Sequence, residues 1–139
     1  MAYVSSASKR QMIKDEVLSA ISGGASAVIY GREIYRLGST TVHARYCSSG
    51  SGNYYKFNIN PNTLRADFEL WICGSRDHYY LIPMSVIEDM YKHPTAYPDN
   101  HHPKIRVVTV DPYAHSAGYA SPSITRDLSP YFRATLRVG

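Results

Sequence analysis

Two residues in the segment TVHARYCSSGSGNYYKFNIN, residues 41–60, carry side chains that can bind an anion. The segment alternates apolar and polar residues on each side of a Gly/Ser turn, which predicts two β-strands. His43 and Arg45 are two residues apart in the first strand, and residues at this spacing project from the same face. An arginine keeps its charge and can bind a phosphate through two N–H groups. We therefore expect either the wall of an anion-binding site or a face that is merely solvated.

Carboxylates with the spacing of a cation site lie on a later predicted strand. Asp67 and Glu69 are again two residues apart, and we expect the strand that carries Lys56 to be the neighbour of theirs. If these faces join the one that carries His43, the carboxylates could hold Mg²⁺ while the lysine moves a proton. The candidate metal ligands are Glu33, Asp67 and Glu69, and Lys56 completes the catalytic set. The alternative is a group of cross-strand ion pairs on a solvated face.

Further cations and one aromatic side chain are candidates for contacts with nucleic acid. Arginine and lysine bind the phosphates, and a tryptophan can stack on a base. Trp71 lies off the core face in the alternation of its strand, which predicts base stacking, a dimer contact or burial under a helix. The candidate nucleic-acid contacts are His43, Arg45, Arg32, Arg36, Lys9, Arg10, Lys104, Arg106 and Trp71.

The bulk properties fit a small cytoplasmic protein with an anionic partner. The chain has 139 residues, a length that suits a single domain, and a net charge of +4 that favours an anion such as DNA. Its thirteen tyrosines suit half-buried strand positions and also a protein interface or a homodimer. Two cysteines are too few for a disulfide framework, so we expect both to be reduced. No apolar run is long enough for a membrane span.

The order of the predicted elements indicates an α+β fold. We expect a single mixed or antiparallel sheet of four to six strands, with an N-terminal helix and a second short helix packed on it. The helices are predicted at 5–22 and 84–92, and the segment from residue 111 is expected to be irregular. The strands are predicted at 26–30, 32–37, 41–47, 54–60, 66–73, 79–83 and 104–110. The predicted buried residues are Val42, Ala44, Tyr46, Phe57, Ile59, Phe68, Leu70, Ile72, Leu81 and Val107.

The segment YYKFNINPNTLRADFELWICGSRDHYYLIPMSVI, residues 54–87, carries a resemblance to a known group of enzymes. Its order of strands resembles the distal half of small nuclease-like domains of the PD-(D/E)XK superfamily, including endonucleases associated with mobile introns. The resemblance covers about residues 8–92. It implies phosphodiester hydrolysis with Mg²⁺, carried out by an acid followed by an acid-x-Lys motif on the next strand.

The chain departs from that motif at both of its positions. His43-Ala44-Arg45 stands where the acid-x-Lys motif is expected. Histidine is a weak ligand for Mg²⁺, and arginine is a poor proton shuttle although it still binds phosphate. We therefore expect a DNA-binding domain that has lost hydrolysis, with Mg²⁺ as a cofactor only if the domain is catalytic. An active Mg²⁺-dependent endonuclease and a Tyr-rich interaction or dimerisation module stay open as alternatives.

Overall fold

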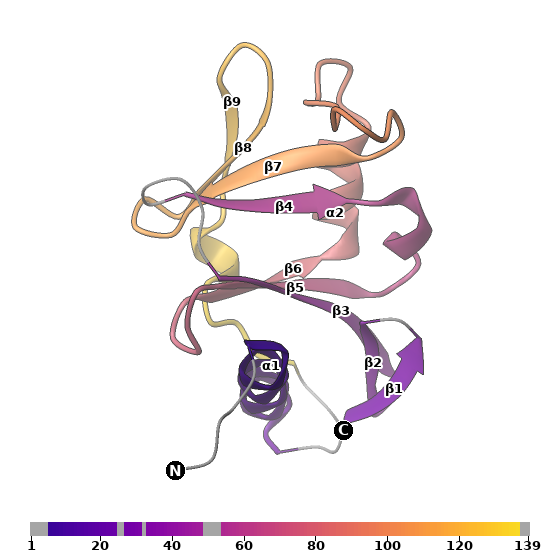
Figure 1. Cartoon of the computed structure of the whole chain (residues 1–139), viewed down its shortest axis with the longest axis vertical. Coiled ribbons are helices and arrows are strands. Elements are labelled where there is room, and N and C mark those ends of the chain that lie inside the picture. Colours follow the sequence, from indigo (N-terminus) through magenta and orange to yellow (C-terminus); the bar gives the residue numbers. More distant parts are fainter. Residues whose placement is uncertain (1–5, 25–26, 32, 49–53, 137–139) are drawn as a thin grey trace.

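The computed structural model describes residues 6–24, 27–31, 33–48 and 54–136 of the chain. These residues form three layers, shown in Figure 1: an N-terminal helix, a central five-stranded sheet and a second, four-stranded sheet. The N-terminal helix is α1 (Ser6–Ser22), and a shorter helix, α2 (Met84–Tyr91), lies on the same side of the central sheet as the second sheet. Within the described ranges, no helix has the length and apolar character needed to cross a membrane.

The central sheet, sheet A, has the strand order β1-β2-β3-β5-β6. Its strands are β1 (Ala27–Gly31), β2 (Ile34–Leu37), β3 (Thr40–Cys47), β5 (Phe68–Cys73) and β6 (Tyr79–Pro83). Neighbouring strands are antiparallel except β3 and β5, which run parallel. Because a parallel pair needs a long crossover connection, the chain between β3 and β5 leaves sheet A and then returns to it.

The second sheet, sheet B, is antiparallel with the order β4-β7-β8-β9. Its strands are β4 (Tyr55–Ile59), β7 (Arg106–Asp111), β8 (Ser116–Ala120) and β9 (Ile124–Asp127). Two short 3₁₀ helices, η1 (Pro61–Thr63) and η2 (Ser129–Tyr131), follow β4 and β9.

The α+β class, the N-terminal helix and the short second helix are confirmed. The expectation of a single sheet is wrong, because β4 pairs with β7 instead of a strand of sheet A. This pairing joins residues far apart in sequence, such as Tyr55 and Val110, so the local pattern does not indicate it. The segment from residue 111 is also not irregular, since it contains β8 and β9. Lys56 consequently lies on sheet B and not beside β5.

α1 packs against sheet A through one side of the helix. Val17, Leu18 and Ile21 are buried there at helical spacing and form an apolar stripe. Lys14 lies one turn before Leu18 on the same side, and its side chain is therefore also drawn in and is only 10% exposed. The apolar stripe of α1 thus places an ammonium group beneath the edge of sheet A.

Sheet A is buried on both faces, which the strand alternation alone did not indicate. Leu70 and Ile72 of β5 face α1, and Trp71 and Cys73 face sheet B and α2. Of the residues predicted to be buried, seven are buried, and Tyr46, Phe68 and Val107 are half-buried. The face of β5 that was expected to meet solvent therefore belongs to a second hydrophobic core, between sheet A and the layer of sheet B and α2.

Trp71 lies in that second core. It is completely buried and its indole ring stacks on Phe57, with ring centroids 4.8 Å apart and planes 7° apart. The prediction of Trp71 as a contact that stacks on a nucleic-acid base is therefore wrong, because the ring is not accessible. Burial under neighbouring elements was one of the three readings of its position.

Trp71 is the sole tryptophan, so its fluorescence reports on this core alone. We expect acrylamide to quench the emission weakly in the native protein and strongly in urea, because the indole is fully buried. Addition of DNA should leave the emission wavelength unchanged. Strong native quenching, or protection from quenching by DNA, would contradict this placement.

Candidate anion-binding site

His43 and Arg45 project from the same side of β3, as the sequence predicts, and both reach the carboxylate of Glu33. The register of the β2–β3 hairpin explains why these side chains reach Glu33. Ile34 is the partner of His43, and the N–H of Ala44 donates a 2.9 Å hydrogen bond to the carbonyl of Glu33. Glu33 therefore lies at the edge of β3, at the point where β2 begins.

His43 forms a buried pair with Glu69, its register partner on the parallel strand β5. The Nδ1 atom lies 2.7 Å and 2.9 Å from the two carboxylate oxygens, and the two residues are 2% and 1% exposed. Burial raises the pKa of Glu69, against the opposing effects of the His43 hydrogen bond and of the charges of His43 and Arg45. The pair fixes the ring of His43 so that its Nε2 atom points towards Glu33.

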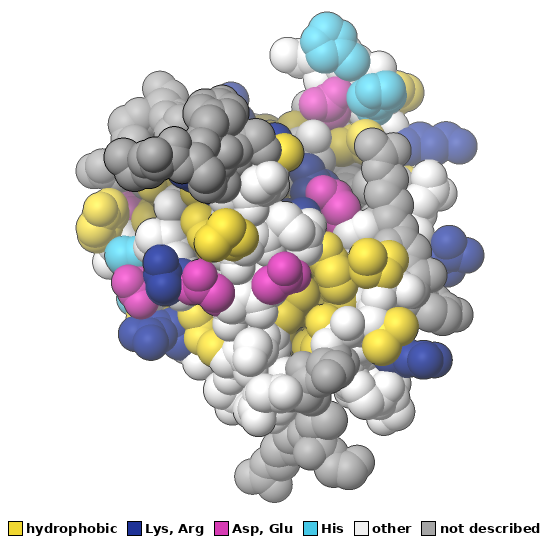
Figure 2. Space-filling view, turned by 60° about the horizontal axis from the view of Figure 1, so that its bottom comes forward, with side chains coloured by type: hydrophobic (Ala, Val, Ile, Leu, Met, Phe, Trp, Pro, Cys, Tyr) yellow, Lys and Arg dark blue, Asp and Glu magenta, His cyan; other side chains and the backbone are white. Residues whose placement is uncertain are grey.

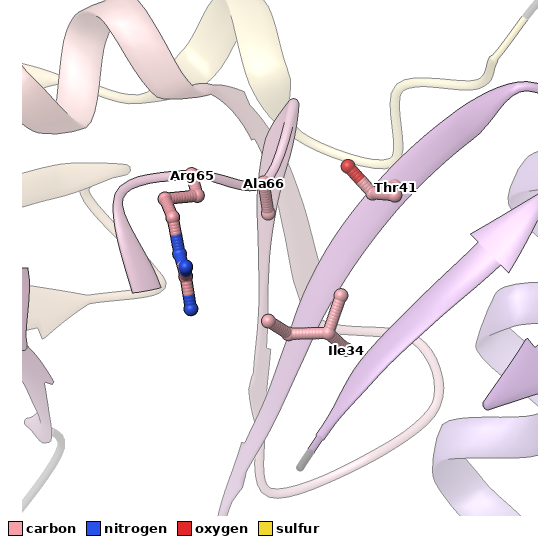
Figure 3. A pocket seen from close by; sticks show the side chains of 4 residues that line it. All are labelled: Ile34, Thr41, Arg65 and Ala66. Carbon is pink, nitrogen blue, oxygen red and sulfur yellow. The ribbon is translucent and has the colours of Figure 1, made fainter. Parts of the chain in front are cut away.

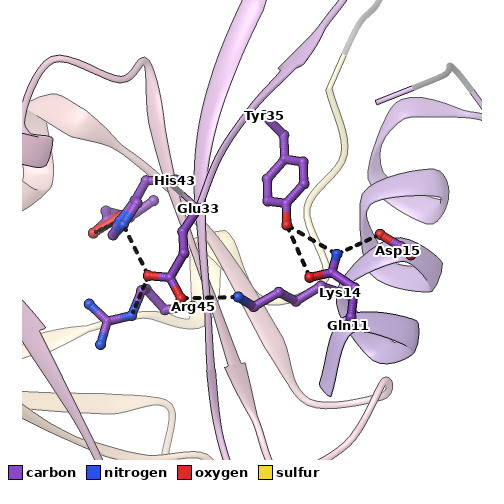
Figure 4. Close-up of polar contacts among 8 residues, drawn as sticks. Gln11, Lys14, Asp15, Glu33, Tyr35, His43 and Arg45 are labelled. Atoms are coloured by element: carbon purple, nitrogen blue, oxygen red, sulfur yellow. Dashed lines mark hydrogen bonds and ion pairs between the residues drawn. The ribbon is translucent and has the colours of Figure 1, made fainter. Parts of the chain in front are cut away.

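Glu33 is surrounded by three nitrogen groups, drawn in Figure 4. Its Oε1 atom lies 3.2 Å from the Lys14 Nζ atom. Its Oε2 atom lies 3.8 Å from the His43 Nε2 atom and 3.6 Å from the Arg45 Nε atom. Partial burial would raise the pKa of this carboxyl, but the charges of Lys14 and Arg45 prevail and hold the pKa below its ordinary value. Glu33 is thus an anion held among an ammonium group, an imidazole ring and a guanidinium group.

Two adjoining hollows extend this cluster along α1. One of about 230 Å³ is lined by Ala7, Arg10, Gln11, Lys14, Glu33 and Tyr46. The other, of about 290 Å³, is lined by Lys9, Arg10, Tyr46 and Ser48. Because both hollows share Arg10 and Tyr46, the structure brings the predicted contacts Lys9 and Arg10 next to the end of β3.

A larger hollow of about 540 Å³ opens beside Ile34, Thr41, Arg65 and Ala66. Figure 3 shows the side chain of Arg65 extending into it, across from Thr41. Thr41 lies two residues before His43 on β3 and shares its face. Sequence reasoning missed Arg65, because the residue follows η1 in a turn where strand alternation assigns no direction.

The three carboxylates predicted as metal ligands are not brought together. Glu33 and Glu69 contact different nitrogens of His43, so the imidazole ring lies between them. Asp67 instead accepts hydrogen bonds from the N–H of Thr41 at 2.9 Å and from its hydroxyl at 3.2 Å. The described ranges hold no group of three or more His, Cys, Asp or Glu residues arranged to bind a metal ion.

The other predicted residues lie elsewhere. Lys56 lines a separate hollow on sheet B with Thr109 and Asp99. Arg106 is held by its own loop, where it donates a 2.6 Å hydrogen bond to the carbonyl of Pro103, and Lys104 is exposed nearby. This end of the molecule is opposite α1 in Figure 1.

Three more arginines were predicted to make specific contacts. Arg36 is exposed on β2, and Arg32 lies outside the described residues. Cross-strand pairing predicts that Arg45 lies within reach of Asp67 or Glu69; among the described residues its ion pair is with Glu33, and its charge also acts on the carboxyl of Glu69. The register of the β2–β3 hairpin places Glu33 closer than either acid of β5.

No protein-family model, curated protein or solved structure matches the chain.

The buried pair can be tested by removing its carboxylate. Glu69→Ala should lower the free energy of unfolding by about 3–5 kcal/mol, because it leaves the buried His43 ring without its partner. Glu69→Gln, which keeps an acceptor oxygen for an Nδ1–H group, should cost less. Urea unfolding measures both.

Glu16→Ala is the matched control, because Glu16 forms an ion pair with Arg76 on the surface. We expect this change to cost less than about 1 kcal/mol. Equal losses for the Glu16 and Glu69 variants would show that the buried pair contributes no more than a surface pair.

Proposed function

We propose that the chain is a DNA-binding domain of nuclease-like ancestry that holds the phosphate backbone and does not cleave it. The observation that carries the proposal is the pair of adjoining hollows at α1, where Lys9 and Arg10 lie beside Tyr46 at the end of β3. Lysine and arginine bind phosphates, and the tyrosine adds an apolar ring to the same surface.

Arg45 is the cation of the cluster best placed for a backbone contact. Its side chain is 33% exposed, and its Nε atom faces Glu33. An arginine has five N–H donors in a planar fork, so the terminal nitrogens stay available to a phosphate. His43, almost fully buried behind it, orients the site and does not reach a duplex unless Glu33 moves.

The contacts of the acids support binding over cleavage. Both oxygens of Glu33 face cationic side chains of the protein, and Glu69 is committed to His43. A carboxylate engaged in this way is a poor ligand for Mg²⁺, which requires near-ideal octahedral geometry. Arg45, in place of a lysine, stays protonated and so does not move a proton.

Fluorescence anisotropy with a labelled duplex, measured over a range of salt concentrations, tests the binding. We expect affinity to fall steeply as salt rises, because bound phosphates release counterions. The double variant Lys9→Ala/Arg10→Ala should weaken binding at low salt and reduce the slope of log K against log salt by about two.

Lys92→Ala/Arg126→Ala is the matched control, since it removes the same charge beside α2 and on β9, on the side of sheet A away from α1. It should leave the salt slope nearly unchanged. Equal effects of the two double variants would indicate attraction by net charge alone. An absence of binding at micromolar protein in low salt would remove the proposal.

Plasmid nicking with and without Mg²⁺ distinguishes this function from that of an active endonuclease. We expect no nicking by the wild-type protein. Cleavage that requires Mg²⁺, and that Asp67→Ala or Glu33→Gln abolishes, would establish the enzyme instead.

A second candidate is a module for self-association, favoured by the exposure of apolar side chains at β1. Val28 is 50% and Ile29 is 74% exposed on this edge strand of sheet A, and Met12 of α1 is 56% exposed. Figure 2 shows apolar side chains gathered on this end of the molecule. An uncovered edge strand with apolar side chains can pair with another chain.

Sedimentation velocity over a range of concentrations tests the second candidate. A homodimer that forms through β1 should be disrupted by Ile29→Lys and should change little with salt. A monomer at all concentrations would leave DNA binding as the sole proposal.

A further inference from the structure

Glu33 occupies a position that an anionic ligand would be expected to fill. Its carboxylate lies between an ammonium group from α1 and two nitrogen groups from β3. The Lys14 contact is within hydrogen-bond range, whereas the contacts to His43 and Arg45, at 3.8 Å and 3.6 Å, are longer than a hydrogen bond. The two oxygens of a carboxylate therefore satisfy this set of donors incompletely.

The ring of His43, the backbone of Arg45 and the stem of Lys14 are held by contacts that do not involve Glu33, whereas the charged ends of Lys14 and Arg45 face Glu33. The ring of His43 is held by the two oxygens of Glu69, and Arg45 stands on β3, which pairs with β5 along its length. The stem of Lys14 is packed beneath the sheet. Donors that are already in place lose little freedom when they bind a ligand, so the arrangement is preorganised.

Glu33 is the residue of the cluster whose side chain can rotate away from the others. Its side chain is 40% exposed, in contrast to 3% for His43 and 10% for Lys14. Its backbone has a φ of 59°, in the left-handed region, which a residue other than glycine seldom adopts. A turn of its side chain outwards leaves the backbone hydrogen bond between the Ala44 N–H and the Glu33 carbonyl in place, so the pairing of β2 with β3 is not broken.

We propose that the Lys14 and Arg45 nitrogens, beside the ring of His43, form a seat for a phosphoryl group, and that the Glu33 carboxylate fills this seat in the free protein as an internal competitor. The inference rests on the proposed function and adds a regulation of the same site. A tetrahedral phosphoryl group offers oxygens in more directions than a carboxylate, and a backbone phosphate supplies the same single negative charge as Glu33.

The charges define the expected effect of removing the competitor. A ligand must displace one negative charge from Lys14 and Arg45 before it can bind, and this lowers its affinity. Glu33→Gln keeps the size of the side chain and removes that charge. We expect the affinity for a DNA duplex at low salt to rise about tenfold, a factor typical of coupling between two competing contacts.

Glu16→Gln is the matched control, because Glu16 is also a carboxylate of this end of the protein and forms an ion pair with Arg76. It changes the net charge by the same amount away from the seat. We expect it to alter the affinity less than about twofold, since exposed charges are screened by salt. Adding Arg45→Ala to Glu33→Gln should cancel the tenfold gain, because the phosphoryl group then loses its exposed donor.

Inorganic phosphate, titrated by calorimetry at constant ionic strength, separates this inference from the proposed function. Phosphate should bind Glu33→Gln more tightly than it binds the wild type or Glu16→Gln, and Arg45→Ala should remove the difference. If Glu33→Gln and Glu16→Gln have the same affinity for phosphate and for DNA, the seat does not exist, while DNA binding at the hollows of α1 stands. If DNA binds no variant but phosphate still prefers Glu33→Gln, the proposed function fails and the seat stands.

Circular dichroism and urea unfolding must show that Glu33→Gln is folded. If it is not, Glu33→Asp serves in its place, because the shorter side chain keeps the charge and withdraws it from His43 and Arg45. The same direction of change, with a smaller gain in phosphate affinity, is then expected. A loss of affinity in a folded Glu33 variant would overturn the inference, since it would make the carboxylate part of the ligand site and not its competitor.

Discussion

The burial of sheet A on both faces is the constraint on which the candidate site depends. Strand β5 runs through the middle of the molecule with α1 on one side and sheet B on the other, and its sequence FELWIC places one carboxylate in this interior. A buried carboxylate must find a hydrogen-bond partner, since its desolvation otherwise costs several kcal/mol. The parallel pairing of β3 with β5 sets His43 beside Glu69 and so supplies that partner.

The His43–Glu69 pair determines which polar contacts form at the surface. Because Glu69 takes the Nδ1 atom of His43, the Nε2 atom is left facing the edge of β3, where Glu33 lies. Glu33 in turn faces Arg45 and Lys14, which belong to two different elements. One series of polar contacts therefore links the interior of sheet A to α1 and to the hollows that carry Lys9 and Arg10. The same contacts hold the helix and determine the charge of the surface beside it.

Local patterns in the sequence were sufficient for the elements and for the shared face of His43 and Arg45. Glu33 is predicted from the sequence as a metal ligand, and the local pattern also contains the register that makes it the ion-pair partner of Arg45. A two-residue turn at Gly38 and Ser39 pairs Leu37 with Thr40, and the same register carries Glu33 to Ala44. Alternation within a single strand does not indicate this register, which depends on the position of the turn.

The other incorrect predictions concern features that the alternation of apolar and polar residues does not indicate. It shows that Trp71 and Leu70 face opposite ways, but not that a second sheet covers the face of Trp71. That cover comes from the pairing of β4 with β7, which depends on the tertiary structure. The position of Lys56 was misjudged for the same reason, since a strand next in sequence need not be next in the sheet. Arg65 lies in a turn, where the direction of a side chain depends on the turn itself.

Glu33 stabilises the protein when no ligand is bound, because it separates two positive charges. Lys14 and Arg45 would stand close to a common point with no anion between them, and like charges held in a partly buried place repel each other. Glu33 offsets that repulsion while the protein is free, at the cost of a left-handed backbone. A bound phosphoryl group would supply the same negative charge from outside, so that the carboxylate becomes dispensable when the ligand is present. The Glu33 carboxylate thus stabilises the folded protein when no ligand is bound. When a phosphoryl group replaces it, the positive charges of Lys14 and Arg45 still have a negative charge between them.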